Sequence, residues 1–203
     1  MDMILDEIER RSADGILHVD LLEDGTVHRR EIAAENGCAG RFQIVLEGAL
    51  NAYSDGEYIQ IDGRMVDFAQ DDIALAAILA HELAHDILDH RQRLNAAGVD
   101  RSLFGGIGHN AAKIRATEAE ADRLSLYLMA NAGLDPAAGI AFWARLGRKA
   151  GAKILPDETH GSSKTRLAML QKELAALKQL REETPSGQLL IPTFAHPPFP
   201  PLR

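Results

Sequence analysis

The segment between Asp71 and Leu88 constrains the fold of this chain most strongly, because its apolar residues recur at helical spacing. Apolar side chains return every three or four residues along it, at Ile73, Leu75, Ala76, Leu79, Leu83, Ile87 and Leu88. Asp71 or Asp72 is suited to cap the N-terminus, where a carboxylate meets the positive end of the helix dipole. The spacing therefore predicts one long helix that contributes an apolar face to the core.

This predicted helix carries an H-E-x-x-H motif, His81-Glu82-Leu83-Ala84-His85. Histidines four residues apart lie about 40° apart around a helix, so both imidazoles can reach one metal ion. Glu82 lies beside that face, where its carboxylate can take a proton from a metal-activated water. The motif predicts a hydrolase with His81 and His85 as metal ligands and Glu82 as general base.

The motif leaves the third metal ligand undefined, and the metzincin arrangement does not supply it. A metzincin needs a histidine six residues after His85, but Arg91 occupies that position. His90 comes one residue early and would lie about 140° from His85 around a continuous helix. We therefore exclude a third histidine on this helix.

A later helix offers carboxylates instead, within Thr117-Glu118-Ala119-Glu120-Ala121-Asp122. Glu118 and Asp122 share one helix face, where bare carboxylates would repel each other unless cationic or metal-bound groups lie between them. We expect Glu118 to be the third ligand and Asp122 to accept a hydrogen bond from the far nitrogen of His81. Glu120 points elsewhere and is expected at the surface or paired with an arginine.

Turn residues and hydrophobic spacing divide the rest of the chain. We expect helices over 2–11, 111–130, 135–143 and 163–183, a hairpin of 16–22 with 26–32, further strands over 42–46 and 58–61, and a turn at Asp62-Gly63. The prediction is an N-terminal appendage over 1–35, a main domain over 36–183 and a proline-rich tail over 184–203, which is expected to be extended from 191 onward.

Composition excludes several classes of protein. Lysine and arginine number 22 against 30 acidic residues, and this net charge of −8 argues against binding to nucleic acid. A lone Cys38 excludes a disulfide framework and a thiolate-rich zinc site. The longest apolar run, 73–80, is too short to span a bilayer, and the first residues lack the features of a signal peptide. We expect a cytoplasmic protein, or a periplasmic or secreted one if a signal segment has been removed.

Three segments resemble peptidase family M48, which contains HtpX-like and CAAX prenyl proteases and soluble periplasmic relatives. They are 79–85, 118–123 and 132–136, within a resemblance that covers roughly 40–180. The resemblance implies an α+β, zincin-like (gluzincin) fold that is mostly helical, with a small β-sheet next to the active-site helix. It also implies one Zn²⁺ per chain, held by His81, His85 and Glu118.

The family also places a histidine before its last helix, with an arginine six residues later. His160 and Arg166 match this spacing, although Gly161 replaces the proline that usually follows the histidine. The resemblance gives His160 two alternative roles: it stabilises the oxyanion of the intermediate, or it occupies the fourth zinc position when substrate is absent. Arg166 is expected to orient that loop or a carboxylate.

The expected function is a zinc metalloendopeptidase that hydrolyses protein or peptide substrates, and the resemblance implies a role in protein quality control. A peptide would dock in extended form along the strand Tyr58, Ile59, Gln60 and Ile61, through main-chain hydrogen bonds. Tyr53 is expected to pack in the core, and its alternative role is to help stabilise the oxyanion. The alternative is a latent or chaperone-like zinc protein with little proteolysis, against which the intact Glu82 argues.

Overall fold

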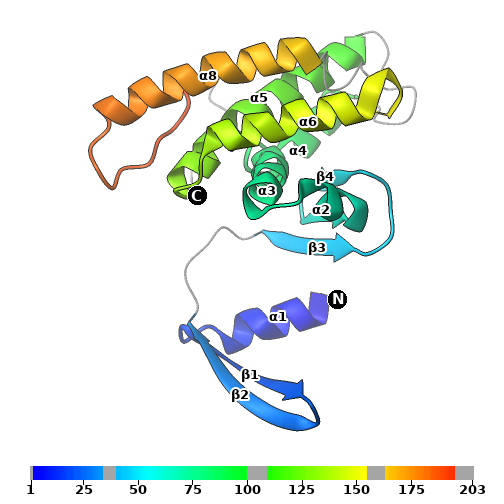
Figure 1. The fold of residues 1–203 in the computed structure, drawn as a ribbon, viewed down its shortest axis with the longest axis vertical. Helices are drawn as coiled ribbons and strands as arrows, with labels where there is room; N and C mark the ends of the chain where they lie inside the picture. Colours follow the sequence, from blue (N-terminus) through cyan, green and yellow to red (C-terminus); the bar gives the residue numbers. More distant parts are fainter. Residues whose placement is uncertain (1, 34–39, 100–108, 155–162, 195–203) are drawn as a thin grey trace. The chain divides into compact units, whose positions relative to one another are not determined.

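The computed structural model describes residues 2–33, 40–99, 109–154 and 163–194. The chain divides into two compact units, Met1–Ala39 and Gly40–Arg203. The first unit holds a helix and a hairpin: α1 (Asp2–Arg11), β1 (Ile16–Glu23) and β2 (Thr26–Ala33) (Figure 1). Asp24 and Gly25 both have positive φ, 50° and 77°, as a tight hairpin turn with matching strand twist requires. The predicted helix and hairpin are confirmed.

The second unit contains a three-stranded sheet of β3 (Arg41–Val45), β4 (Ala52–Ser54) and β5 (Tyr58–Asp62). The strand order is β3-β5-β4, with β3 parallel and β4 antiparallel to β5. Ile59 and Ile61 are buried on one face, as the alternation of side chains along a strand dictates. β5 is therefore the central strand, and both of its edges are paired.

Six helices are described in the second unit: α2 (Gly63–Ala69), α3 (Asp72–Ile87), α4 (His90–Ala96), α5 (His109–Asn131), α6 (Pro136–Ile154) and α8 (Ser163–Glu183). Asp71 caps α3 by accepting a 2.7 Å hydrogen bond from the Ala74 backbone, as predicted. The predicted turn at Asp62-Gly63 is wrong, because Asp62 is the residue before α2 and Gly63 begins that helix. The mix of helices and small sheets is an α+β architecture.

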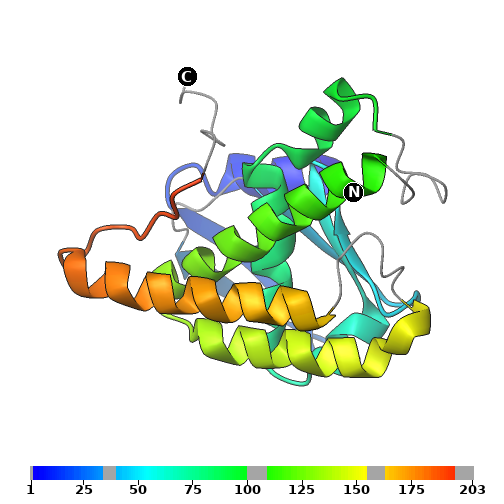
Figure 2. The same ribbon diagram turned by 90° about the horizontal axis from the view of Figure 1, so that it is seen from above.

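Helix α3 lies between the sheet and the helices α5 and α6, and its apolar residues join those of all these elements in one core (Figure 1). α6 and α8 run side by side, with α6 packed against α3 and both helices packed against α5 (Figure 2). At Gly139 in α6 an added Cβ would lie 2.9 Å from the Met129 sulfur and 3.2 Å from the Ala77 Cβ. This glycine permits the close approach of α6 to α3 and α5.

The described part of the tail, 184–194, has no regular structure, as predicted for 191–194, and hydrogen bonds hold it against α5. Asn131 donates to the Leu190 carbonyl and accepts from the Leu190 N–H, both at 2.9 Å. Arg123 donates to the Thr193 carbonyl at 3.0 Å. Within the described ranges, no helix combines the length and apolarity needed to cross a membrane.

Candidate metal centre

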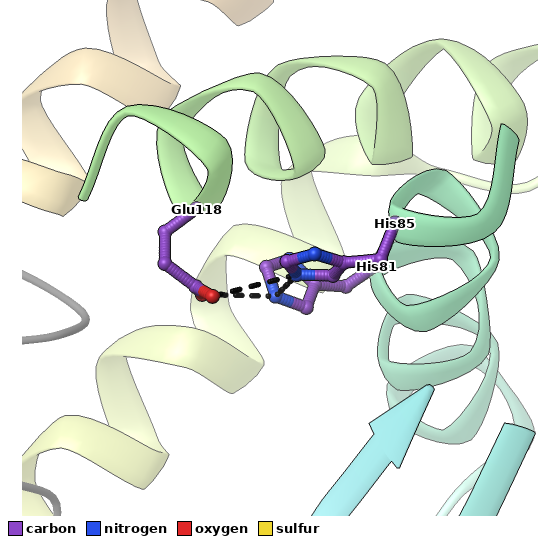
Figure 3. Close-up of side chains that lie close together, drawn as sticks. All are labelled: His81, His85 and Glu118. Carbon is purple, nitrogen blue, oxygen red and sulfur yellow. Dashed lines mark hydrogen bonds and ion pairs between the residues drawn. The ribbon is translucent and has the colours of Figure 1, made fainter. Parts of the chain in front are cut away.

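Two helices bring three potential metal ligands together. His81 and His85 are one turn apart on α3, and their Nε2 atoms are 3.2 Å apart. Glu118 reaches them from α5, with carboxylate oxygens 3.4 Å from His81 Nε2 and 3.5 Å from His85 Nε2 (Figure 3). Among the described residues, these three form the one His/Cys/Asp/Glu cluster with donor atoms all within 4.8 Å of one another.

The spacing of these donors fits a tetrahedral metal ion. A zinc ion with bonds of about 2.0–2.1 Å has ligand atoms about 3.3 Å apart along each tetrahedral edge. The observed separations of 3.2, 3.4 and 3.5 Å are close to that value. Two imidazoles and a carboxylate also form a donor set typical of catalytic zinc sites, which use three protein ligands.

The two histidines differ in their affinity for a proton. Burial by itself lowers the pKa of His81, but the carboxylates of Asp122 and Glu118 outweigh it and raise the pKa to about 10. Burial lowers the pKa of His85 to about 3. In the metal-free protein His81 is therefore the protonated, cationic imidazole of the pair, and His85 is neutral. A metal bound at Nε2 displaces that proton, because coordination requires a neutral imidazole.

The far side of His81 faces a buried ion pair. His81 Nδ1 lies 3.0 Å from Asp122 Oδ1, where the sequence pattern places this carboxylate. Arg166 donates to both Asp122 oxygens, and its guanidinium lies 4.2 Å from the centroid of the Trp143 ring. Burial would raise the pKa of Asp122, but Arg166 and His81 hold it below its usual value. Of the two roles predicted for Arg166, the geometry favours orienting a carboxylate.

The three donors open onto a cleft of about 410 Å³, and Glu82 lines it with them. The Glu82 side chain is buried, with a relative exposure of 9%. Residues from the sheet side complete the wall, including Asn51, Ala52, Tyr53, Ser54 and Gly56. The arrangement places a carboxylate beside the metal ligands in a space that can admit a substrate.

The predicted substrate strand, Tyr58, Ile59, Gln60 and Ile61, does not have a free edge. These residues pair with Arg41–Ile44 of β3 on one side, and Ile59–Ile61 pair with β4 on the other. Their backbone groups are therefore used within the sheet, and the expectation of a docking strand there is wrong. Among the described strands, β4 is the one that borders the cleft and has an edge without a neighbouring strand.

Tyr53 is also placed differently from the prediction. Its side chain is not in the core: the residue is 42% exposed, lines the cleft and donates a 2.9 Å hydrogen bond to Gln60 Oε1. The reason is alternation along the short strand β4, which turns Tyr53 away from the buried face. His160 lies outside the described residues, as does the glycine-rich segment 103–108, which the sequence offers as a candidate lid.

Sequence reasoning missed one residue of the site, His90. The prediction assumed a continuous helix, in which His90 faces away from His85. The helix instead ends at Ile87, and Asp89 adopts a left-handed conformation with φ 53° and ψ 36°. This bend turns the chain so that His90 Nδ1 lies 2.9 Å from His85 Nδ1. Aspartate adopts this conformation more readily than most residues, so the residue type at position 89 was the one indication in the sequence that the helix ends before His90.

Three ligand atoms and a buried glutamate at one cleft are the features of a metal-dependent hydrolase centre. Comparison with known proteins agrees with this class. Residues 27–114 match peptidase family M48, a range that includes α3 and ends before Glu118. The mitochondrial metalloendopeptidase OMA1 of Schizosaccharomyces pombe is 31% identical in an alignment of 131 residues that covers 53% of this chain. The chain spans 38% of that relative's length. Both comparisons support family M48 and a metalloprotease.

Proposed function

We propose that this chain is a zinc-dependent endopeptidase of family M48 that hydrolyses peptide bonds in protein substrates. The observation that carries the proposal is the triangle formed by His81, His85 and Glu118, whose edges match those of a tetrahedral zinc site. Glu82 lies in the same cleft, and the match to family M48 includes the helix that carries it. A role in protein quality control belongs to the same proposal and rests on the family resemblance.

Bound zinc would polarise the scissile carbonyl and make water nucleophilic near neutral pH. Residues of the chain transfer the proton and bind the substrate. Glu82 accepts a proton at its carboxylate and delivers it to the leaving amine, as a general base and then a general acid. The free edge of β4 offers backbone groups for an extended peptide, with Tyr53 beside it. His160 has two alternative roles in this proposal: it stabilises the oxyanion, or it blocks the fourth zinc position when substrate is absent.

The site also supports a second function, a latent or chaperone-like protein that holds zinc without rapid cleavage. The two functions differ in their need for Glu82, since only proteolysis requires a general base there. Proteolysis is the better supported, because Glu82 lines the same cleft as the three metal ligands, where a general base would act.

The test is metal content and cleavage of a casein-derived peptide for wild type and Glu82→Gln. We expect one zinc per chain in both proteins, and a loss of cleavage of about 10²–10⁴-fold in the variant. Glu183→Gln is the matched control, since Glu183 is exposed at the end of α8, and it should leave both measurements unchanged. Cleavage that survives Glu82→Gln, or zinc-loaded wild type that cleaves nothing, would contradict the proposal.

The ligand assignment has its own test. Glu118→Ala removes one of three donors and should abolish stoichiometric zinc in protein prepared with excess metal. The experiment compares metal content after dialysis for this variant and for Glu57→Ala, a change at an exposed glutamate. Equal zinc in Glu118→Ala and wild type would show that Glu118 is not a ligand.

A further inference from the structure

A second series of polar side-chain contacts begins at Nδ1 of His85, the ring nitrogen that faces away from the metal centre. His85 Nδ1 lies 2.9 Å from His90 Nδ1, and His90 Nε2 lies 3.1 Å from Glu120 Oε2. Arg93 donates to the same Glu120 oxygen at 2.7 Å and to the other oxygen at 3.3 Å. The contacts link His85 of α3 to α4 and α5 in an unbroken line.

Because the His90 ring is buried, its nitrogens depend on neighbouring side chains for their hydrogen bonds. His90 is 1% exposed, so water has little access to its ring. A buried imidazole N–H without an acceptor costs free energy comparable to that of a lost hydrogen bond. Each ring nitrogen in this line therefore depends on the neighbour that the fold supplies.

Metal coordination decides the direction of every hydrogen bond in the line. A metal at His85 Nε2 leaves the proton of that ring on Nδ1, which must donate. The atom within reach is His90 Nδ1, which accepts only when the His90 proton is on Nε2. His90 Nε2 then donates to Glu120, whose carboxylate is held by Arg93. The geometry permits one consistent arrangement of protons.

We propose that His90 is a positioning residue that fixes the ring and tautomer of His85 for metal binding, with Glu120 and Arg93 holding His90. The proposal rests on the proposed function, because it takes His85 as a metal ligand. His81 has an equivalent support in Asp122 and Arg166. Each ligand histidine would then be oriented by a path that ends in a carboxylate–arginine pair.

The first test measures zinc affinity by competition with a chelator. His90→Ala should weaken binding about 10–100-fold, the usual effect of removing a group that orients a metal ligand. His90→Asn should recover most of the affinity, because its Oδ1 can take the place of Nδ1 as acceptor. His18→Ala is the matched control, since His18 is an exposed histidine of the first unit, and it should bind zinc as the wild type does.

The second test reads the tautomers directly and needs no substitution. Nitrogen-15 NMR of the zinc-loaded wild-type protein should show His90 protonated on Nε2 and bare at Nδ1. Donation by His85 Nδ1 and acceptance by the Glu120 carboxylate both require that tautomer. A proton on His90 Nδ1 would overturn the proposal even if His90→Ala fails to fold.

The outcomes separate this proposal from the proposed function. Zinc affinity of His90→Ala within about two-fold of wild type would overturn the role of His90 and leave the peptidase intact. Zinc-loaded wild type that cleaves no peptide would overturn the function, while weaker binding in His90→Ala would still support the positioning role. Wild type without stoichiometric zinc would overturn both.

Discussion

Arg166 donates two hydrogen bonds to Asp122, from Nε to Oδ2 at 2.7 Å and from Nη2 to Oδ1 at 2.6 Å. The Asp122 side chain is 2% exposed and that of Arg166 is 11% exposed. Such a bidentate pair fixes the plane of the carboxylate, and the carboxylate in turn faces Nδ1 of His81. α8 thus contributes to the orientation of a metal ligand on α3 through a residue of α5.

Removal of the arginine should destabilise the fold strongly. Arg166→Met leaves the charge of Asp122 buried without its main partner, and we expect a loss of about 3–5 kcal/mol in the free energy of unfolding. Arg166→Lys should lie between this variant and wild type, because an ammonium group cannot form the paired bonds. Urea denaturation of metal-free protein measures both. A loss below about 1 kcal/mol in Arg166→Met would show that the pair behaves like a surface ion pair.

Trp143 should report metal binding through its fluorescence. It is the one tryptophan of the chain, and its ring centroid lies 5.3 Å from that of His81. Co²⁺ at the site would be close enough to quench the indole emission, so titration with Co²⁺ should lower the fluorescence until one equivalent is bound. Glu118→Ala should remove the stoichiometric quenching. Quenching that never saturates would indicate non-specific binding instead.

Position 89 should accept glycine without loss of stability or zinc affinity, whereas alanine there should reduce both. Its φ of 53° lies in the left-handed region, which glycine adopts freely and which costs alanine about 1–2 kcal/mol. Asp89→Ala should therefore lower the stability of metal-free protein and weaken zinc binding, because the bend at residue 89 places His90 beside His85. Asp89→Gly should retain the zinc affinity of wild type. Equal behaviour of the two variants would contradict a role for this bend.

Tyr127 should give the protein a stability that falls at high pH. Burial and the hydrogen bond to Glu173 raise the pKa of Tyr127 to about 12, above its ordinary value of 10.0. The folded state thus holds the phenolic proton more tightly, so stability is unaffected below pH 10 and declines as the pH rises toward 12. We expect a decline of roughly 1–2 kcal/mol after allowance for solvent screening.

Denaturation of wild type and Tyr127→Phe across this pH range is the measurement for that prediction. The variant should start from a lower stability, because Glu173 loses a hydrogen bond, but it should show a weaker decline. Tyrosinate absorbance provides a second readout, since the last tyrosine to ionise in the wild type should be absent from the variant. Identical pH profiles would contradict the assignment.

Several elements could be predicted from sequence because their signals are local. The helix expected over 163–183 has the same bounds as α8, and the residue types narrowed the cap of α3 to Asp71 or Asp72, of which the structure selects Asp71. The missed elements are short. β4 has three residues and is stabilised by pairing with β5, while α2 and α4 have seven residues each. Such segments carry too little periodicity to be recognised without their tertiary contacts.

By itself, the sequence determined that His81 and His85 share one helix face, because a spacing of four residues fixes this in any α-helix. It also identified Glu118 and Asp122 as candidates on a second helix. Only the tertiary structure decided the separations of the donors, since these depend on how α5 packs against α3. It likewise decided that β4 borders the cleft and that His90 turns toward His85. Helix spacing is a local property, whereas strand order and the packing of helices depend on contacts between residues far apart in the chain.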